Sequence, residues 1–152
     1  MRLRPDHVIW VLKYLYRRDG NDPERQHGGC QILKSLAADL DQPVELVLGI
    51  DDICEPCKYN HDGRCTDGLN WTPKITKQEW VERRDAVAMR LLKVSSGTTT
   101  SARELFALFE QRLPLLAALQ PDYHDYEPGC LKGRRDQALY AEGLRRVRRH
   151  SD

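Results

Sequence analysis

The sequence lacks an excess of charge of either sign, and it lacks a long apolar run. Lysine and arginine together number 24 against 23 aspartate and glutamate residues, which gives a net charge of +1. Because the two charge counts are nearly equal, there is no general attraction to nucleic acid or to an anionic membrane surface. Such a partner would need a local basic patch. No stretch of about 18 apolar residues is present, so no segment reads as a membrane-spanning helix.

An export signal is also missing from the opening segment, MRLRPDHVIW, because Pro5, Asp6 and His7 interrupt any apolar run. The five cysteines are an odd number, and their crowding does not fit a secreted disulfide framework. We therefore expect a soluble, cytoplasmic protein whose cysteines bind metal or take part in redox chemistry. No recognisable set of catalytic residues names a reaction.

Internal repeats and low-complexity tracts are absent, and 152 residues is the usual size of one domain. We interpret 1–152 as a single domain. It would comprise a metal-binding core at 1–95, which contains a cysteine-rich loop at 51–74, and a C-terminal helical extension at 101–152.

Hydrophobic periodicity predicts a mostly α fold with a short β element. Thr76 with Glu79, and Ser101 with Glu104, have the spacing of capping boxes, in which each side chain accepts the other residue's backbone N–H. Pro114 should kink or restart the helix that opens at Ser101. With these signals, helices are predicted at about 5–18, from Cys30 to about 40, at 77–94, from Ser101 onward, and at 134–149.

The segment VELVLGI, residues 44–50, alternates in the manner of a strand that leads into the cysteine loop. Its apolar side chains on one face would be Val44, Leu46, Leu48 and Ile50. The loop that follows contains several glycines and prolines and has no helical period. We expect all three tryptophans to pack in the core or to shield a metal site: Trp10, Trp71 and Trp80.

The cysteine loop carries the chemistry. Cys54 and Cys57 form a C-x2-C pair, which lets two thiolates from one tight turn reach the same metal, and Gly63 permits a reversal that brings in Cys65. Two other interpretations are weaker. Buried cysteines would have no reason to cluster in a polar loop, and a thioredoxin-like CEPC motif should open a helix, which KYNHDGRC cannot continue.

A fourth ligand must come from elsewhere. Candidates are Cys30, Cys130, His61, His7 and His27. Cys30 is preferred, because it lies where a polar loop meets a helix N-terminus, whose unpaired N–H groups stabilise a thiolate. We expect His61 to be an exposed turn residue and His7 to be a capping or surface residue. Asp51 and Asp52 are expected to shape the loop by accepting backbone N–H groups.

The segments LRPDHVIW, GIDDICEPC, DGRC and VERRD resemble a family of unknown function, domain family 1284, over about residues 3–110. The resemblance implies iron–sulfur binding by Cys54, Cys57 and Cys65. The family's opening motif reads L-R-P-H-H and ends in a cysteine, whereas this chain has Trp10 at that position. Members also tend to end in a further C-x2-C cluster, where this chain offers only Cys130.

Two classes of function follow. In the first, Cys54, Cys57, Cys65 and Cys30 hold an iron–sulfur cluster, with [4Fe–4S] favoured and Cys130 as the alternative fourth ligand, in an accessory, electron-transfer or redox-sensing protein with a protein partner. In the second, zinc at the same cysteines is structural.

The second class would leave recognition of a protein or nucleic acid to the basic segment 131–152. That segment carries seven basic and three acidic residues. Cations at a helix C-terminus are also favoured by the helix dipole alone, and we prefer that explanation.

Overall fold

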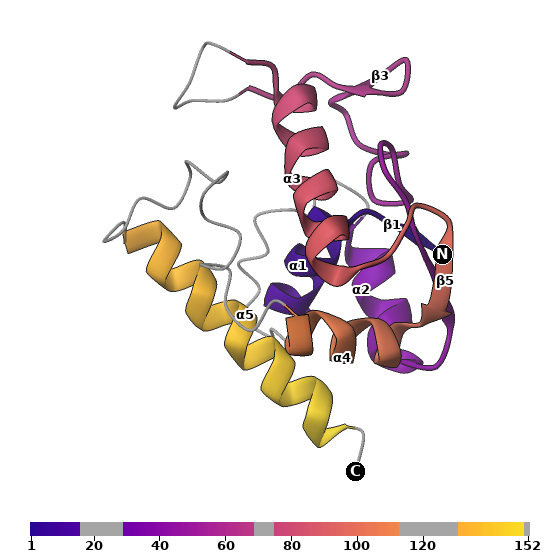
Figure 1. The fold of residues 1–152 in the computed structure, drawn as a ribbon, viewed down its shortest axis with the longest axis vertical. Helices are drawn as coiled ribbons and strands as arrows, with labels where there is room; N and C mark the ends of the chain where they lie inside the picture. The colour runs from indigo at the N-terminus through magenta and orange to yellow at the C-terminus, as the bar shows by residue number, and fades with distance from the viewer. Residues whose placement is uncertain (16–28, 69–74, 113–130, 151–152) are drawn as a thin grey trace.

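The computed structural model describes residues 1–15, 29–68, 75–112 and 131–150 (Figure 1). Within these ranges five helices surround a small sheet, which confirms a mostly α fold with a short β component. The helices are α1 (Pro5–Tyr14), α2 (Gly29–Ala38), α3 (Lys77–Leu92), α4 (Ala102–Arg112) and α5 (Leu131–Arg149). The strands are β1 (Arg2–Leu3), β2 (Pro43–Leu46), β3 (Asn60–His61), β4 (Arg64–Cys65) and β5 (Thr98–Ser101).

The main sheet has the strand order β1-β2-β5, with β1 parallel and β5 antiparallel to the central strand. The predicted strand at 44–50 is too long, because β2 ends at Leu46. Beyond it Leu48 is 48% exposed, and Gly49 has a φ of +94° that turns the chain. The segment SSGTTTS, for which no strand was predicted, supplies β5, whose β-branched threonines suit a strand.

Both predicted capping boxes are present. Thr76 accepts from the Glu79 N–H and the Glu79 carboxylate accepts from the Thr76 N–H at the start of α3, while Ser101 and Glu104 exchange equivalent bonds at the start of α4. Helix α3 ends at Leu92, where Lys93 takes the left-handed conformation of a C-cap.

Two helix boundaries differ from expectation. Helix α1 ends at Tyr14, and residues 16–18 of the predicted helix lie outside the described residues, as does Pro114. Helix α5 begins at Leu131, three residues before its predicted start.

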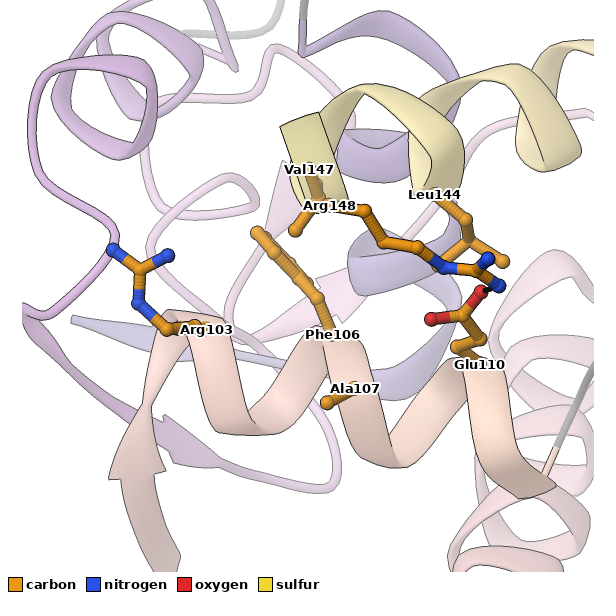
Figure 2. A pocket seen from close by; sticks show the side chains of 7 residues that line it. All are labelled: Arg103, Phe106, Ala107, Glu110, Leu144, Val147 and Arg148. Atoms are coloured by element: carbon orange, nitrogen blue, oxygen red, sulfur yellow. Dashed lines mark ion pairs between the residues drawn. The ribbon is translucent and has the colours of Figure 1, made fainter. Parts of the chain in front are cut away.

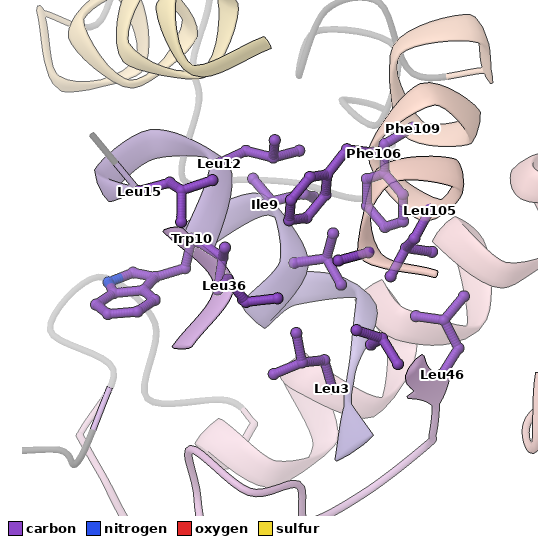
Figure 3. Close-up of a cluster of buried hydrophobic side chains, with 14 of the residues drawn as sticks. Leu3, Ile9, Trp10, Leu12, Leu15, Leu36, Leu46, Leu105, Phe106 and Phe109 are labelled. Atoms are coloured by element: carbon purple, nitrogen blue, oxygen red, sulfur yellow. The ribbon is translucent and has the colours of Figure 1, made fainter. Parts of the chain in front are cut away.

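The core lies between α1, α4 and the sheet (Figure 3). Its largest fully buried side chains include Ile9, Leu12, Phe106 and Phe109. Trp10 and Trp80 are buried as expected, and Trp71 lies outside the described residues. Helix α5 contacts both α1 and α4. It approaches α1 so closely that a Cβ on Gly143 would lie 1.7 Å from the Leu12 carbonyl oxygen.

No helix in the described parts of the chain combines the length and apolarity needed to cross a bilayer.

Candidate metal centre

Asp51 organises the start of the cysteine loop. Its side chain is fully buried, and its Oδ1 accepts the backbone N–H groups of Ile53 and Cys54 at 3.2 and 3.0 Å. Its Oδ2 accepts the N–H of Arg4, at the junction of β1 and α1, at 2.9 Å. The predicted role of Asp51 in shaping the loop is confirmed, and the same carboxylate ties the loop to the N-terminal segment.

Asp52 has a similar but more exposed role. Its Oδ2 accepts the Arg2 N–H at 2.8 Å, and its Oδ1 accepts the Arg2 Nε–H at 3.1 Å. The expectation that Asp52 accepts N–H groups of its own turn is wrong, because it instead accepts from the backbone and side chain of Arg2 on β1.

His7 is not the capping or surface residue that we expected. Its side chain is only 16% exposed, and its Nδ1 lies 2.8 Å from the Asp51 Oδ2. The same nitrogen lies 3.9 Å from the Cys54 Sγ. The reason is tertiary. Parallel pairing of β1 with β2 brings the first turn of α1 against the loop that follows β2, and a pattern of local periodicity carries no information about that pairing.

The possible ligand atoms of His7, Asp51 and Cys54 all lie within 4.8 Å of one another. Among the described residues, these three form a group with the composition of a metal site. An ionised carboxylate only accepts hydrogen bonds, so the His7 Nδ1 must carry the proton that faces Asp51. The Arg4 guanidinium lies against the same ring, with its Nη2 3.1 Å from the His7 Nε2 and its Nε 3.3 Å from the Nδ1. With His7 in contact with Asp51 and Arg4, and Asp51 accepting four N–H groups, Cys54 is the residue of the three whose ligand atom makes only a long contact, 3.9 Å to the His7 Nδ1.

Electrostatics explains what the Cys54 thiol can do. Burial and the neighbouring Asp51 carboxylate raise the pKa of Cys54 to about 12, and Arg4 only partly opposes them. A thiol in such surroundings is a poor nucleophile at neutral pH. It becomes a thiolate when a cation replaces its proton. Burial alone would raise the pKa of Asp51. His7 and Arg4 outweigh it and keep the pKa of this carboxyl below its usual value.

Cys57 and Cys65 lie on the outer part of the loop. The Cys57 N–H donates to the Cys54 carbonyl at 2.9 Å, and the Asn60 N–H donates to the Cys57 carbonyl at the same distance. Asn60 is paired across the β3–β4 hairpin with Cys65. Cys54, Cys57 and Cys65 are thus linked by two successive turns and one strand pairing, and CEPC lies in turns rather than at a helix start.

The hairpin itself is closed by two residues, Asp62 and Gly63, with φ values of 50° and 75°. Positive φ at both central positions is the geometry of a type I′ turn, for which Asp-Gly is a preferred sequence. The expected reversal at Gly63 is confirmed. His61 is exposed on β3, as predicted.

Cys30 occupies the first turn of α2, as its second residue, and its side chain lies outside the described residues. The preceding residue, Gly29, lies against the Trp10 ring, where a Cβ would come within 2.5 Å of the ring. Trp10 is one helical turn from His7 on α1. Cys130 and His27 lie outside the described residues.

A buried layer of charge supports α1 behind the metal centre. The Asp85 Oδ1 accepts the Asp6 N–H at 2.8 Å, which caps the start of α1 from α3. The Asp6 carboxylate lies 2.7 Å from the Arg84 Nη2 and 3.8 Å from the Arg4 Nη2. Against the effect of burial, Arg84 and Arg4 lower the pKa of Asp6, whereas burial raises the pKa of Asp85.

The sequence offered His7 as a candidate ligand but favoured a capping or surface role for it, and the polar residues of α3 were missed. One usable signal was present, because Gln78 and Asp85 are seven residues apart, on the same face of α3 as the apolar residues that pack in the core. Polar residues on a buried face need partners, and here those partners are the Cys65 N–H for Gln78 and the Asp6 N–H for Asp85.

A separate pocket of about 250 Å³ lies between α4 and α5 (Figure 2). Phe106, Leu144 and Val147 form its apolar part. The Arg148 guanidinium is paired with Glu110, and Arg103 is paired with Asp41 at 2.8 Å. Because both rim cations already have carboxylate partners, the pocket shows no charged group directed at a ligand.

The fold and this site define a small, mostly helical protein with a cysteine loop anchored on a buried aspartate. Comparison with protein families matches residues 28–119 to the family described as Protein of unknown function (DUF1284). The match covers more than half of the chain, and the protein belongs to this family. The opening segment with His7 lies before the matched range. Searches of curated proteins and of solved structures give no match.

Proposed function

We propose that the protein binds an iron–sulfur cluster through Cys54, Cys57 and Cys65, with Cys30 as the fourth ligand, and that it acts as an accessory, electron-transfer or redox-sensing protein in a reducing compartment. The observation that carries the proposal is a buried thiol, Cys54, in a turn whose backbone is already fixed by hydrogen bonds. Cys54 is 6% exposed, its N–H donates to Asp51 at 3.0 Å, and its Sγ makes only a long contact of 3.9 Å, to the His7 Nδ1.

The residues fit a thiolate-bound group better than a site made from His7, Asp51 and Cys54 together. His7 and Asp51 are fully hydrogen-bonded to each other, to Arg4 and to the loop backbone. Such groups orient a ligand and set the polarity around it. Their part is to hold Cys54 and to exclude water, and the thiolates of the loop bind the metal.

Zinc remains the second candidate, as a structural metal. Four ligands around one zinc at about 2.3 Å from each sulfur would place the thiolates within about 4 Å of one another. Cys54, Cys57 and Cys65 do not form a group of this kind in the described structure. The three sulfurs would have to come closer together to bind zinc. A cubane cluster takes one thiolate at each iron and so spaces its ligands more widely.

Cys30 is supported as the fourth ligand by a path of contacts. The path runs from Cys54 to His7, along one turn of α1 to Trp10, and from the Trp10 ring to Gly29, the residue beside Cys30. The resemblance implies a cysteine ligand at position 10, and Cys30 lies close to the side chain that replaces it. When bound, the cluster would supply one-electron redox chemistry.

The partner is proposed to be a redox or assembly protein. Nucleic-acid binding by the basic face of α5 is not favoured, because Arg145 and Arg146 are paired with Glu142 and Arg148 with Glu110.

The test is elemental analysis of anaerobically purified protein for iron, acid-labile sulfide and zinc, with a visible spectrum, on wild type, Cys30→Ala and Cys130→Ala. We expect about four irons and four sulfides per chain, retained in Cys130→Ala and reduced in Cys30→Ala. Stoichiometric zinc without sulfide, in protein never exposed to air, would replace the proposal with structural zinc.

A further inference from the structure

We propose that Gln78 is a positioning residue for Cys65, and that α3 braces the two parts of the metal centre against each other. This inference rests on the proposed function, because it treats Cys65 as a ligand. Its structural basis is a hydrogen bond between a helix side chain and the backbone of the hairpin.

Gln78 lies in the first turn of α3 and is only 6% exposed. Its Oε1 accepts the Cys65 backbone N–H at 2.7 Å. Its Nε2 donates to the Glu82 carboxylate, one turn further along α3, also at 2.7 Å. The second bond fixes the orientation of the amide, since a carboxylate only accepts and therefore selects the NH₂ end. The oxygen is thereby held toward Cys65.

The β3–β4 hairpin needs such a support. Its strands have two residues each, and hydrogen bonds such as Thr66 to Tyr59 and Asn60 to Glu55 connect residues within the loop. A two-stranded hairpin without outside contacts is at best marginally stable in water. The bond to Gln78 connects it to a helix that is anchored in the core.

The same helix holds the other part of the centre. Asp85, two turns beyond Gln78, caps the N-terminus of α1, and Arg84 pairs with Asp6 on α1. His7 on α1 contacts Cys54. Helix α3 therefore connects Cys65 at its first turn to the Cys54 side at its middle. A rigid connection of this kind sets the separation of two ligands before metal arrives, which lowers the cost of ordering them on binding.

The experiment compares wild type with three variants. Gln78→Met keeps the side-chain length and removes both bonds. The double variant Gln78→Glu plus Glu82→Gln exchanges the two side chains and restores an acceptor at 78 and a donor at 82. Gln42→Met is the matched control, because the Gln42 amide also binds backbone groups, in this case the Ser35 and Asp39 carbonyls, which lie outside the cysteine loop.

Two quantities are measured. The first is the hydrogen-exchange rate of the Cys65 amide in metal-free protein. The second is the rate at which a ferrous chelator removes iron from anaerobically reconstituted protein. We expect Gln78→Met to raise the exchange rate at Cys65 roughly five- to tenfold, the effect of losing one hydrogen bond, and to speed iron loss severalfold. The double variant should return both rates to near wild type, and Gln42→Met should change neither.

Unchanged exchange at Cys65 in Gln78→Met would overturn the inference. It would equally be overturned if Gln42→Met sped iron loss as much as Gln78→Met, because general destabilisation would then suffice. Wild-type protein that holds no iron and sulfide would instead contradict the proposed function, while the exchange measurement on metal-free protein would still report whether Gln78 holds Cys65.

Discussion

The cysteine loop has an inner part and an outer part that are stabilised by different means. The inner part, residues 51–54, is buried, and Asp51 gathers N–H groups from β1, α1 and the loop itself. The outer part, residues 55–68, is mostly exposed and consists of turns and a short hairpin. The inner part takes its geometry from the fold, whereas the outer part is held by local turns and by Gln78.

This difference indicates where a bound metal would stabilise the protein most. One proposed ligand, Cys54, is already fixed in the folded chain, so metal binding need not restrict its conformation further. The ligands of the outer part still gain order from a bound metal, and binding free energy there acts as folding free energy. Changes to the inner part should therefore reduce the stability of the whole protein, and changes to the outer part should mainly reduce metal retention.

The largest effect is expected for Asp51→Asn. The substitution removes a buried charge that accepts four N–H groups and leaves some of them without a partner, which costs about 3–5 kcal/mol of unfolding free energy. Asp52→Asn, at a more exposed neighbour, should cost less than about 1 kcal/mol. Urea unfolding of metal-free protein measures both. Equal losses for the two variants would mean that the inner part has no special role in stability.

The contribution of Asp51 should also depend on pH. Its pKa in the folded protein is lowered, by His7 and Arg4 against the effect of burial. The stabilisation is therefore fully present above the unfolded pKa, near 4, and is lost as pH falls through the lower folded pKa. The difference in unfolding free energy between wild type and Asp51→Asn should stay constant from about pH 7 to 5 and shrink below about pH 4. A difference that grows on acidification would contradict this assignment.

His7 and His61 provide the next comparison, with one histidine on each part. His7→Leu removes the donor to a buried carboxylate and should cost about 1–3 kcal/mol. His61 is exposed on β3, so His61→Leu should change stability by less than about 0.5 kcal/mol. Iron content after anaerobic purification should fall in His7→Leu and be unchanged in His61→Leu. A loss of iron in His61→Leu would make that residue a ligand.

The smallest effect is expected at the turn of the hairpin. Gly63 has a φ of +75°, a conformation that costs a residue with a Cβ about 1 kcal/mol. Gly63→Ala should leave the urea midpoint of metal-free protein nearly unchanged and should speed iron loss to a chelator. A large shift of the midpoint would show that the hairpin is part of the cooperative core.

Much of the fold was predictable because its signals are local. The capping boxes at Thr76 and Ser101 identify helix starts by side chains three residues apart, and both are present. The Asp-Gly turn and the bonds of Asp51 to its own loop are local in the same sense. By contrast, β5 and the exposed Leu48 depend on which strand pairs with which. Periodicity does not specify pairing, so strand limits were wrong there.

The candidate site divides in the same way. Spacing along the chain identified Cys54, Cys57 and Cys65, which are close in sequence. His7 contacts a residue 47 positions away, and Gln78 contacts one 13 positions away. Neither contact can be predicted from local hydrophobic periodicity, so an isolated histidine at a helix start was assigned to the surface. What the sequence did contain was the pair of polar residues on the buried face of α3.

The most direct test of the two-part loop is amide hydrogen exchange across residues 51–68 in the same protein with its metal bound and after the metal is removed under anaerobic conditions. We predict that the Cys54 amide, which donates to Asp51, stays protected in both states, while protection of the amides from Cys57 to Asn60, which Gln78 does not hold, falls by at least about tenfold on metal removal. Equal protection of these amides in both states, or loss of protection at Cys54 along with them, would contradict a loop whose inner part is set by the fold and whose outer part gains order from the metal.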